Sequence, residues 1–419
     1  MKRYLTFLWD CFRLSFTGDW RYHLWMTVLT LISLGGVYAY SQQLVNGLIT
    51  TGMTDQVSWG LYIANFTYLV GLAAAAAMLV IPVYVYRNLH LHDVVIFGEL
   101  LAVSVILMCL LFVTVDLGRP DRFLHLLLRF NFPMSMLTWD VIALNGYLLL
   151  NLHICGYLIY CAYCGRKPSK AFYIPFVFVA IAWAISIHTV TAFLYVGLGG
   201  RPFWNSAIIA PRFLASAFAA GPAFIILTLQ IVRRFTRHQV SDEALFTLRR
   251  IVQVAMIINL FLLVCELFTE FYADTAHGAS AHYLFLGLHG HNALVPWIWT
   301  AIVLNLLATA LFMLPASRAL PTLNAACVMA IIGIWIEKGM GLIVPAFVPT
   351  PLGEMVEYLP TLHETMVCLG IWAFGLLVYT ILVRVSVPVL AGEITFARRW
   401  GRPAPGAPDS HSSDALKTT

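Results

Sequence analysis

The sequence predicts a polytopic α-helical integral membrane protein with ten transmembrane helices, and three observations lead to this prediction. Hydrophobic residues make up 60% of the 419-residue chain and charged residues only 11%, with a mean hydropathy of +0.82. Such values lie outside the range that is usual for soluble globular domains. Ten apolar stretches each have about 20 or more residues, the length that a helix needs to cross a bilayer. The basic residues, in addition, gather in alternate loops.

The first 20 residues mix aromatic and basic side chains, among them Trp9, Phe12 and Arg13. This pattern predicts a short amphipathic helix on the membrane surface. The first apolar stretch has no cleavage site, so we expect it to remain as an anchor. The expected spans cover residues 22–45, 57–86, 91–115, 136–163, 171–197, 207–232, 246–273, 291–316, 320–345 and 360–389.

The distribution of Lys and Arg predicts the orientation, because positively charged loops stay in the cytoplasm. With the N-terminus inside, nineteen of these residues lie on the inner face, while Lys338 falls within a span. The outer face has only Arg119, Arg122, Arg129, Arg201 and Arg212. We therefore expect a bacterial inner-membrane protein with both termini in the cytoplasm and its active face toward the periplasm. An archaeal membrane remains an alternative.

Several classes of function are disfavoured. The basic residues lie between spans instead of forming a patch, so no nucleic-acid partner is expected. The eight cysteines lie mostly within spans, and Cys161 and Cys164 are more typical of helix packing than of a metal or redox pair. Haem is disfavoured because the only histidines well inside spans, His153 and His188, lie at different depths. We expect neither haem nor metal in this chain.

Charged side chains inside apolar stretches indicate sites that move protons or ions, because each costs about 2.5–3.5 kcal/mol to insert. Glu99 in the third span lies about 12 Å from the cytoplasmic end, and His153 in the fourth lies about 16 Å from that same end. We therefore expect the two side chains to meet. With Asp93 at the inner mouth they predict a proton path from the cytoplasm, and the alternative is a structural hydrogen bond between adjacent helices.

A second set of residues lies near the outer ends of the first helices. It consists of Trp59, Tyr62, Asn65, Asp116, Arg119, Trp139 and Asp140. Aromatic faces beside acids and an arginine suit a flat ring whose two carbonyls must be hydrogen bonded and protonated, and a quinone has that shape. The alternative is that Trp59 and Trp139 belong to the aromatic belt at the membrane surface.

The second half of the chain has its own charged residues in the outer halves of its spans. They are His188, Glu266, Glu270, Glu337, Lys338, His363 and Glu364. Lys338 paired with Glu266 or Glu337 would form a structural lock, because opposite charges neutralise each other. A second proton or ion path through His188, Glu266 and Lys338 is the alternative.

Three motifs resemble the NrfD-like family of membrane subunits, which includes the polysulfide reductase anchor. They are Asp116-Leu-Gly-Arg-Pro120, Trp59-Gly-Leu-Tyr62 and Asn131-Phe-Pro-Met-Ser135. The resemblance covers essentially the whole hydrophobic region. Ten spans instead of eight resemble the longer branch of the family, with the membrane subunits of alternative complex III, hydrogenase-2, Dsr and Qrc, and most of all the Qrc-type menaquinone reductases.

This resemblance implies a haem-free quinone-binding subunit with two four-helix bundles and two flanking spans. The expected divisions are a surface helix (1–20), a first span with its outer loop (21–56), a first bundle with the quinone site (57–200), a second bundle (201–347), a last span (348–396) and a disordered tail (397–419). By motif position the family's quinone-site residues correspond to Trp59, Tyr62, Asn65, Asp116, Arg119 and Asp140. His188 and Glu266 correspond only by their span.

The resemblance also implies partners and a reaction. A periplasmic iron-sulfur protein, linked to a multihaem cytochrome c and a molybdopterin-family subunit, would pass electrons to menaquinone, with proton uptake through Glu99 and His153. Arg122, Arg129 and Arg201 would help to dock this partner, and membrane lipid would surround the rest. Two alternatives remain: a quinol-oxidising subunit that works in the reverse direction, and a secondary transporter with a site at the midplane.

Overall fold

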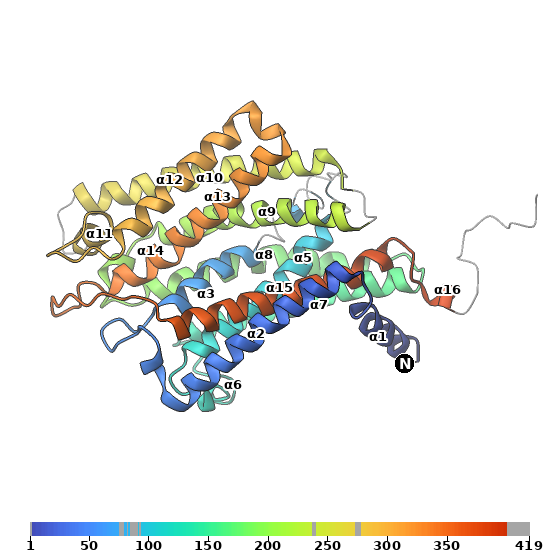
Figure 1. Ribbon diagram of the computed structural model, residues 1–419, viewed down its shortest axis with the longest axis horizontal. Coiled ribbons are helices and arrows are strands. Elements are labelled where there is room, and N and C mark those ends of the chain that lie inside the picture. Colours follow the sequence, from blue (N-terminus) through green and yellow to red (C-terminus); the bar gives the residue numbers. More distant parts are fainter. Residues whose placement is uncertain are drawn as a thin grey trace, which may run out of the picture.

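The structure is a computed structural model that describes residues 2–74, 79–81, 83, 91, 94–236, 240–272 and 278–399. Its elements are almost all helices (Figure 1). The α-helices are α1 (Lys2–Ser15), α2 (Trp20–Asn46), α3 (Leu61–Ala73), α5 (Val95–Asp116), α6 (His125–Leu128), α7 (Met136–Tyr163), α8 (Lys170–Val196), α9 (Ile209–Phe235), α10 (Asp242–Tyr272), α11 (Gly278–Phe285), α12 (Val295–Met313), α13 (Leu320–Lys338), α14 (Met340–Ile343), α15 (Leu362–Leu390) and α16 (Phe396–Arg399).

Nine segments within the described residues are helical, long and apolar enough to cross a membrane. They match nine of the ten expected spans, with α13, α14 and the following turn forming one of them, Leu320–Phe347. The expected span at 57–86 is described as α3 over 13 residues and beyond that only at isolated positions. The chain is therefore an all-α, multi-pass membrane protein.

Local side-chain chemistry fixes the ends of several spans. Asp19 caps α2 by accepting a hydrogen bond from the backbone N–H of Tyr22 at 3.0 Å. The same helix ends at Gly47, whose φ of 81° is a left-handed conformation that glycine adopts without strain. At the start of α15, Thr361 caps the helix by accepting from the N–H of Glu364 at 3.2 Å. These polar residues stand at the edges of the apolar stretches, where spans are expected to begin and end.

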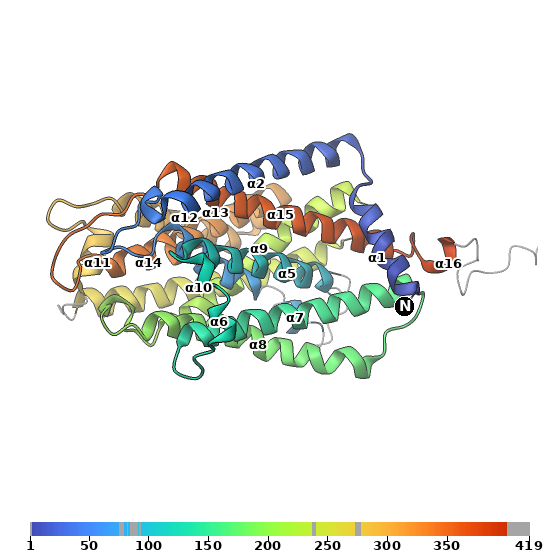
Figure 2. The same cartoon turned by 90° about the horizontal axis from the view of Figure 1, so that it is seen from below.

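Burial separates a central helix from a peripheral one. In the most apolar window of α5, 83% of the residues are buried inside the protein, against 17% for α2. The central helix packs against α3, α7 and α15, and α2 pairs along its length with α15 (Figure 2). A Cβ atom on Gly36 of α2 would lie 2.6 Å from the Cα of Gly370, so the close approach of α2 and α15 requires both glycines.

The helices run between two ends of an elongated molecule. Helices α1 and α16 lie at one end, and α6, α11 and α14 lie at the other (Figures 1 and 2). Because successive long helices alternate in direction, the starts of α3, α7 and α15 meet the ends of α5 and α8 at the end remote from α1. The candidate residues with the outer loops therefore gather at this end of the protein.

Candidate functional site

The start of α3 is held by a buried carboxylate from the distant helix α15. Glu364 has no exposed surface and accepts hydrogen bonds from the N–H groups of Leu61 at 3.0 Å and Gly52 at 3.1 Å. The hydroxyl of Tyr358 donates to the same carboxylate and accepts from the N–H of Leu61 at 2.7 Å. Burial and the neighbouring Glu364 both raise the pKa of Tyr358, which keeps this hydroxyl protonated as a donor.

Tyr62, the second residue of this helix, is completely buried. Its hydroxyl donates to Oε1 of Gln43 on α2 at 2.7 Å, and Nε2 of Gln43 donates to the carbonyl of Val115 on α5 at 2.6 Å. The next residue on α5 is Asp116, whose Oδ1 is buried and has no hydrogen-bond partner among the described residues. Asp116 also lies within electrostatic range of Glu364. We call Gln43, Tyr62, Asp116, Tyr358 and Glu364 the α3 site.

Asn65 has partners on two other helices. Its Oδ1 accepts hydrogen bonds from the indole N–H groups of Trp335 at 3.0 Å and Trp372 at 2.9 Å. Its Nδ2 donates to the carbonyl of Leu61 at 2.8 Å. Because a carbonyl oxygen has two lone pairs and both are used, Asn65 can accept a bond from a ligand only by giving up one tryptophan. It ties α3 to α13 and α15.

Trp59 lies half-buried in a group of aromatic rings just before α3. Its ring centroid is 5.9 Å from that of Tyr195, 5.6 Å from Trp204 and 6.0 Å from Phe347. The guanidinium of Arg201 lies 4.2 Å from the centroid of Phe347, and burial lowers its pKa. Arg201, expected to help dock a partner, therefore packs against this aromatic group.

Three further expected quinone-site residues have other hydrogen-bond partners and are not part of the α3 site. Asp140 is buried and accepts a hydrogen bond from the hydroxyl of Thr191 at 2.7 Å. Trp139 is exposed and donates to the carbonyl of Pro133, as in an interfacial belt. Arg119 is exposed and makes two 3.0 Å hydrogen bonds to Asp121. The structure thus joins Tyr62 and Asp116 in one site but does not bring Trp139 or Arg119 into it.

Glu99 and His153, which were expected to meet, do not lie together, and this pairing was wrong. The buried carboxylate of Glu99 accepts a bond from the thiol of Cys155 at 3.4 Å. His153 instead packs against α8, with its ring centroid 4.4 Å from that of Phe176. His153 and Cys155 are two residues apart on α7, and on a helix with 3.6 residues per turn such residues point in different directions. Only Cys155 therefore faces Glu99. Asp93 lies outside the described residues.

Glu99 also lines an internal pocket of about 210 Å³ between α5, α7 and α8. Tyr147, Asn151 and Val177 are among its other lining residues. The backbone carbonyl of Tyr147 accepts a hydrogen bond from Nδ2 of Asn151 at 2.8 Å. A buried acid thus lines a mostly apolar space within the helix bundle.

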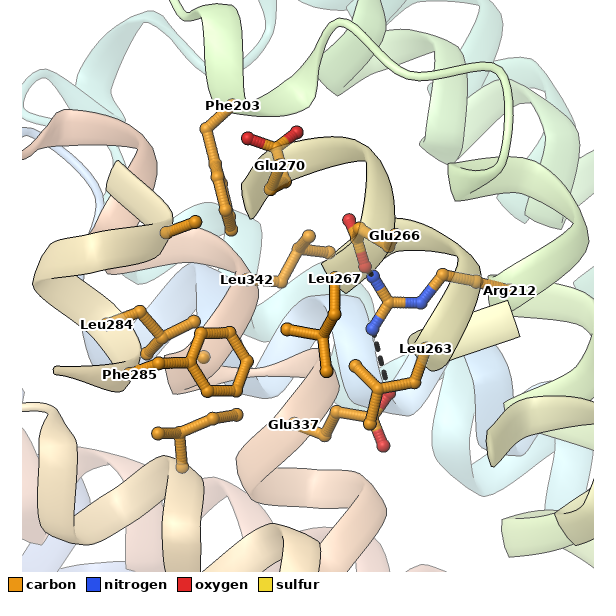
Figure 3. Close-up of a pocket in the computed structure, with 13 residues that line it drawn as sticks. Phe203, Arg212, Leu263, Glu266, Leu267, Glu270, Leu284, Phe285, Glu337 and Leu342 are labelled. Carbon is orange, nitrogen blue, oxygen red and sulfur yellow. Dashed lines mark hydrogen bonds and ion pairs between the residues drawn. The ribbon is translucent and has the colours of Figure 1, made fainter. Parts of the chain in front are cut away.

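The second half of the chain contains a buried group of four charges from three helices, and Figure 3 draws three of these residues, Arg212, Glu266 and Glu337. Arg212 on α9 pairs with Glu266 on α10 and, at 2.9 Å, with Glu337 on α13. Lys338 places its Nζ 2.8 Å from Oε1 of Glu337. All four residues are at most 7% exposed, and their formal charges sum to zero. We call Arg212, Glu266, Glu337 and Lys338 the charge cluster.

The second carboxylate oxygen of Glu337 is also bonded. It accepts from the side-chain amides of Asn259 at 3.1 Å and Asn305 at 2.8 Å. Arg212 was counted among the charges of the outer face, but its side chain lies buried near the start of α9 and pairs with other charged side chains there. Four helices, α9, α10, α12 and α13, therefore meet at Glu337.

A pocket with about 370 Å³ of empty space lies beside this cluster (Figure 3). Charged and apolar side chains both line it: Arg212, Glu266, Glu270, Glu337, Phe203, Phe285 and Leu342 are among them. Figure 3 shows Phe203 and Glu270 at one side of the pocket and the bond from Arg212 to Glu337 at the other. We call this space the first pocket.

Sequence reasoning missed several residues that complete these sites: Gln43, Tyr358, Asn259, Asn305 and Trp335. Three of them are amides inside or at the edge of apolar stretches, and that is the signal that could have identified them. Glu364 was grouped with the second half of the chain, but it holds the start of α3. Among residues within the described ranges, no group of three or more His, Cys, Asp or Glu side chains is placed to hold a metal ion.

Several known proteins are similar to this chain, and the three described here are named as subunits of reductases or of an oxidoreductase. A putative membrane subunit of dimethyl sulfoxide reductase from Halobacterium salinarum is 26% identical, with 75% of each chain covered. A selenate reductase subunit from Mesobacillus selenatarsenatis is 23% identical over 91% of this chain and 98% of its own. An Hdr-like menaquinol oxidoreductase integral membrane subunit from Archaeoglobus fulgidus is 22% identical over 64% of this chain and 65% of its own.

The family model described as polysulphide reductase, NrfD, matches residues 50–348. This range begins before α3 and ends after α14, so it includes the helices α3, α5 and α7 to α13. Because the match covers more than half of the 419 residues, the chain belongs to the NrfD family of polysulphide reductase membrane subunits.

Proposed function

We propose that this chain is the quinone-interacting membrane subunit of a respiratory oxidoreductase complex, and that menaquinone reacts at the α3 site. Its family and the names of its relatives, which are subunits of reductases and of a menaquinol oxidoreductase, support the class of complex. The aromatic group around Trp59 adjoins the same end of α3 and offers flat apolar surfaces for a ring. Menaquinone would be a substrate and not a resident cofactor.

The single observation that supports this location best is the unpaired Oδ1 of Asp116. Buried polar atoms in native proteins nearly always have a partner, so an unpaired one indicates a missing ligand or water. Reduction of a quinone adds two electrons and two protons to its two oxygens. A carboxyl at hydrogen-bond distance can supply one of these protons. The hydroxyl of Tyr62 donates to Gln43 at 2.7 Å, so it would orient a carbonyl oxygen only by giving up this bond.

We propose that electrons arrive from a periplasmic iron-sulfur partner, linked to a multihaem cytochrome c and a molybdopterin-family subunit as in the Qrc-type reductases. The segment between α5 and α7 exposes three basic side chains, Arg119, Arg122 and Arg129. They would attract an acidic surface on the partner protein. The relative named menaquinol oxidoreductase favours the reverse direction as a second candidate. In that case Asp116 would accept a proton from the quinol.

We propose further that ten spans cross a bacterial inner membrane with both termini in the cytoplasm. Two four-helix bundles, at residues 57–200 and 201–347, would lie beside the flanking spans at 21–56 and 348–396. The contacts of α3 with α5 and α8, of α9 with α10 and α13, and of α2 with α15 support this division. Glu99 would carry protons toward the α3 site, since it faces the internal pocket next to α7.

The test is Asp116→Asn in the purified native complex, with Asp121→Asn as the matched control. Asn keeps the shape of the side chain but cannot transfer a proton, so we expect quinone turnover to fall by about 10²-fold or more. Asp121 is exposed and bonded only to Arg119 among the described side chains, so its variant should turn over normally. Normal turnover by Asp116→Asn would contradict the proposed site.

A further inference from the structure

The charge cluster lies between two pockets that do not share a lining residue. Glu337 lines the first pocket. Lys338, the next residue, lines a second pocket of about 270 Å³ between α3, α9 and α13, with Thr67, Tyr68, Gly71 and Ser216 among its other lining residues. The Nζ of Lys338 and Oε1 of Glu337 are 2.8 Å apart. One hydrogen bond therefore connects the two pockets.

Both pockets contain polar groups that a water molecule would satisfy. Tyr68 is one of the residues that line the second pocket, and its hydroxyl is buried and has no hydrogen-bond partner among the described residues. Nε of Arg212, beside the first pocket, likewise has none within the described ranges. Most of the volume given for each pocket is space between atoms or open to the outside, and the enclosed part has room for about one ordered water. Because both are partly polar, the structure favours hydration over dry cavities.

We propose that Lys338 and Glu337 form a proton-transfer step between the second pocket and the first. The ammonium of Lys338 gives a proton to the carboxylate of Glu337, leaving a neutral amine and a neutral carboxyl. Glu337 then releases that proton to water in the first pocket. Lys338 takes a proton from water in the second pocket, so that one proton has moved and both residues regain their charges.

Arg212 has a different part in this step. Its guanidinium keeps its charge at all physiological pH values, so it cannot carry the proton. Its pairs with Glu266 and Glu337 favour the ionised carboxylate and therefore the release of the proton from Glu337. The amides of Asn259 and Asn305 hold the other oxygen of Glu337 in place.

The two pockets also differ in position along the helices. Arg212 is the residue of α9 that lines the first pocket. The residues of α9 that line the second pocket extend along the helix to Ala220. Eight residues of α-helix correspond to about 12 Å. The second pocket thus extends toward the end that holds α1, so transfer from Lys338 to Glu337 moves a proton toward the opposite end, which is the periplasmic one under the proposed orientation.

The inference rests on the proposed function, because quinone chemistry at α3 would drive the transfer. Helix α13 contacts α3 directly: Trp335 donates to Asn65, and a Cβ on Gly339 would lie 3.0 Å from the carbonyl oxygen of Ala64. Asn65 lies one turn from Tyr62, and Trp335 lies two residues before Glu337. A shift of α3 during quinone turnover would therefore reach the charge cluster.

The test uses the native complex in proteoliposomes and measures two quantities: quinone turnover in the presence of an uncoupler, and protons moved per electron. The main variant is Lys338→Arg, with Lys170→Arg at the exposed start of α8 as the control. Arginine keeps the positive charge and the pair with Glu337 but does not release a proton. We expect the variant to keep its quinone turnover in the presence of the uncoupler. The number of protons moved per electron should fall to the number that quinone reduction alone requires.

A purely structural role for Lys338 predicts the opposite, because arginine would satisfy it and proton movement would stay at the control value. That result overturns the inference. The variant that combines Glu337→Gln with Lys338→Gln keeps the cluster neutral, and it should show the same loss if Lys338→Arg fails to assemble. Absence of quinone turnover in the unmodified complex would instead overturn the proposed function, and this inference with it.

Discussion

Glu364 and Glu337 are both almost completely buried carboxylates, but they have different kinds of partner. Glu364 accepts from two backbone N–H groups and a tyrosine hydroxyl, all of them neutral donors. Glu337 is bonded to Arg212 and Lys338. Loss or gain of a proton at the α3 site therefore leaves no cation unpaired, while any change of charge in the charge cluster does. The same residue type can therefore change its charge alone in one region, while in the other a proton can pass through Glu337 only with a matching change at Lys338.

The largest effect is expected when the balance of the charge cluster is broken. Arg212→Gln leaves Glu266 without its cationic partner and gives the cluster a net negative charge. Removal of one partner of a buried ion pair typically costs about 3–5 kcal/mol, so we expect a strongly lowered thermal unfolding temperature in detergent. Arg122→Gln, at an exposed position, is the control and should not change it.

Restoring neutrality should recover much of this loss. In the double variant Arg212→Gln with Glu266→Gln, only the pair of Glu337 and Lys338 remains charged, so no charge is left unbalanced. If the double variant is as unstable as Arg212→Gln alone, the stability comes from the shape of the arginine and not from its charge.

A smaller effect is expected at the α3 site. Glu364→Gln keeps one carbonyl acceptor but replaces the other oxygen by an NH₂ group that cannot accept from Gly52 or Leu61. An unsatisfied buried donor costs about 1–3 kcal/mol, which we expect as a drop in the free energy of unfolding. The control is Glu354→Gln at an exposed position. A loss as large as that of Arg212→Gln would mean that Glu364 has a cationic partner as well.

The link between the two regions should have a still smaller effect. Trp335→Phe removes one of the two indole donors to Asn65 and keeps an aromatic ring. A single neutral hydrogen bond contributes about 0.5–1.5 kcal/mol, so a modest lowering of the unfolding temperature is expected. Trp372→Phe removes the other donor and is the matched comparison. A severe loss with either variant would show that the rings, and not the hydrogen bonds, hold these helices together.

The smallest effect is expected for the exposed pair of Arg119 and Asp121. The guanidinium lowers the pKa of Asp121, so the pair contributes at pH values above the ordinary aspartate pKa of about 4 and is lost as the pH falls through the lower folded-state value. Solvent screens such pairs, so the contribution is small and Arg119→Ala should lower the unfolding temperature at pH 7 only slightly. A clear drop at pH 7 would indicate that Arg119 has a partner other than Asp121.

Hydropathy predicted the fold well because a bilayer imposes a minimum length on each span. Residues 136–163 were expected as a span, and α7 has these bounds. The pairings between helices were not predictable to the same degree, because they depend on the rotation of each helix about its axis. Thus Glu99 meets Cys155 and not His153, and Arg212, which was counted with the outer face, points inward to the charge cluster. Motif positions predicted Tyr62 and Asp116 as site residues. Gln43, which bonds Tyr62, and Glu364, which bonds Leu61, come from distant parts of the sequence and could not be predicted in this way.

The location of the quinone is tested most directly by photoaffinity labelling of the native complex with an azido derivative of menaquinone, followed by peptide mapping. Because Tyr62 and Asp116 line the proposed site, the label should appear in residues 57–74 and 109–122, and excess menaquinone should abolish it. Labelling confined to residues 263–285, beside the first pocket, would contradict the account, because it would place the quinone at the charge cluster.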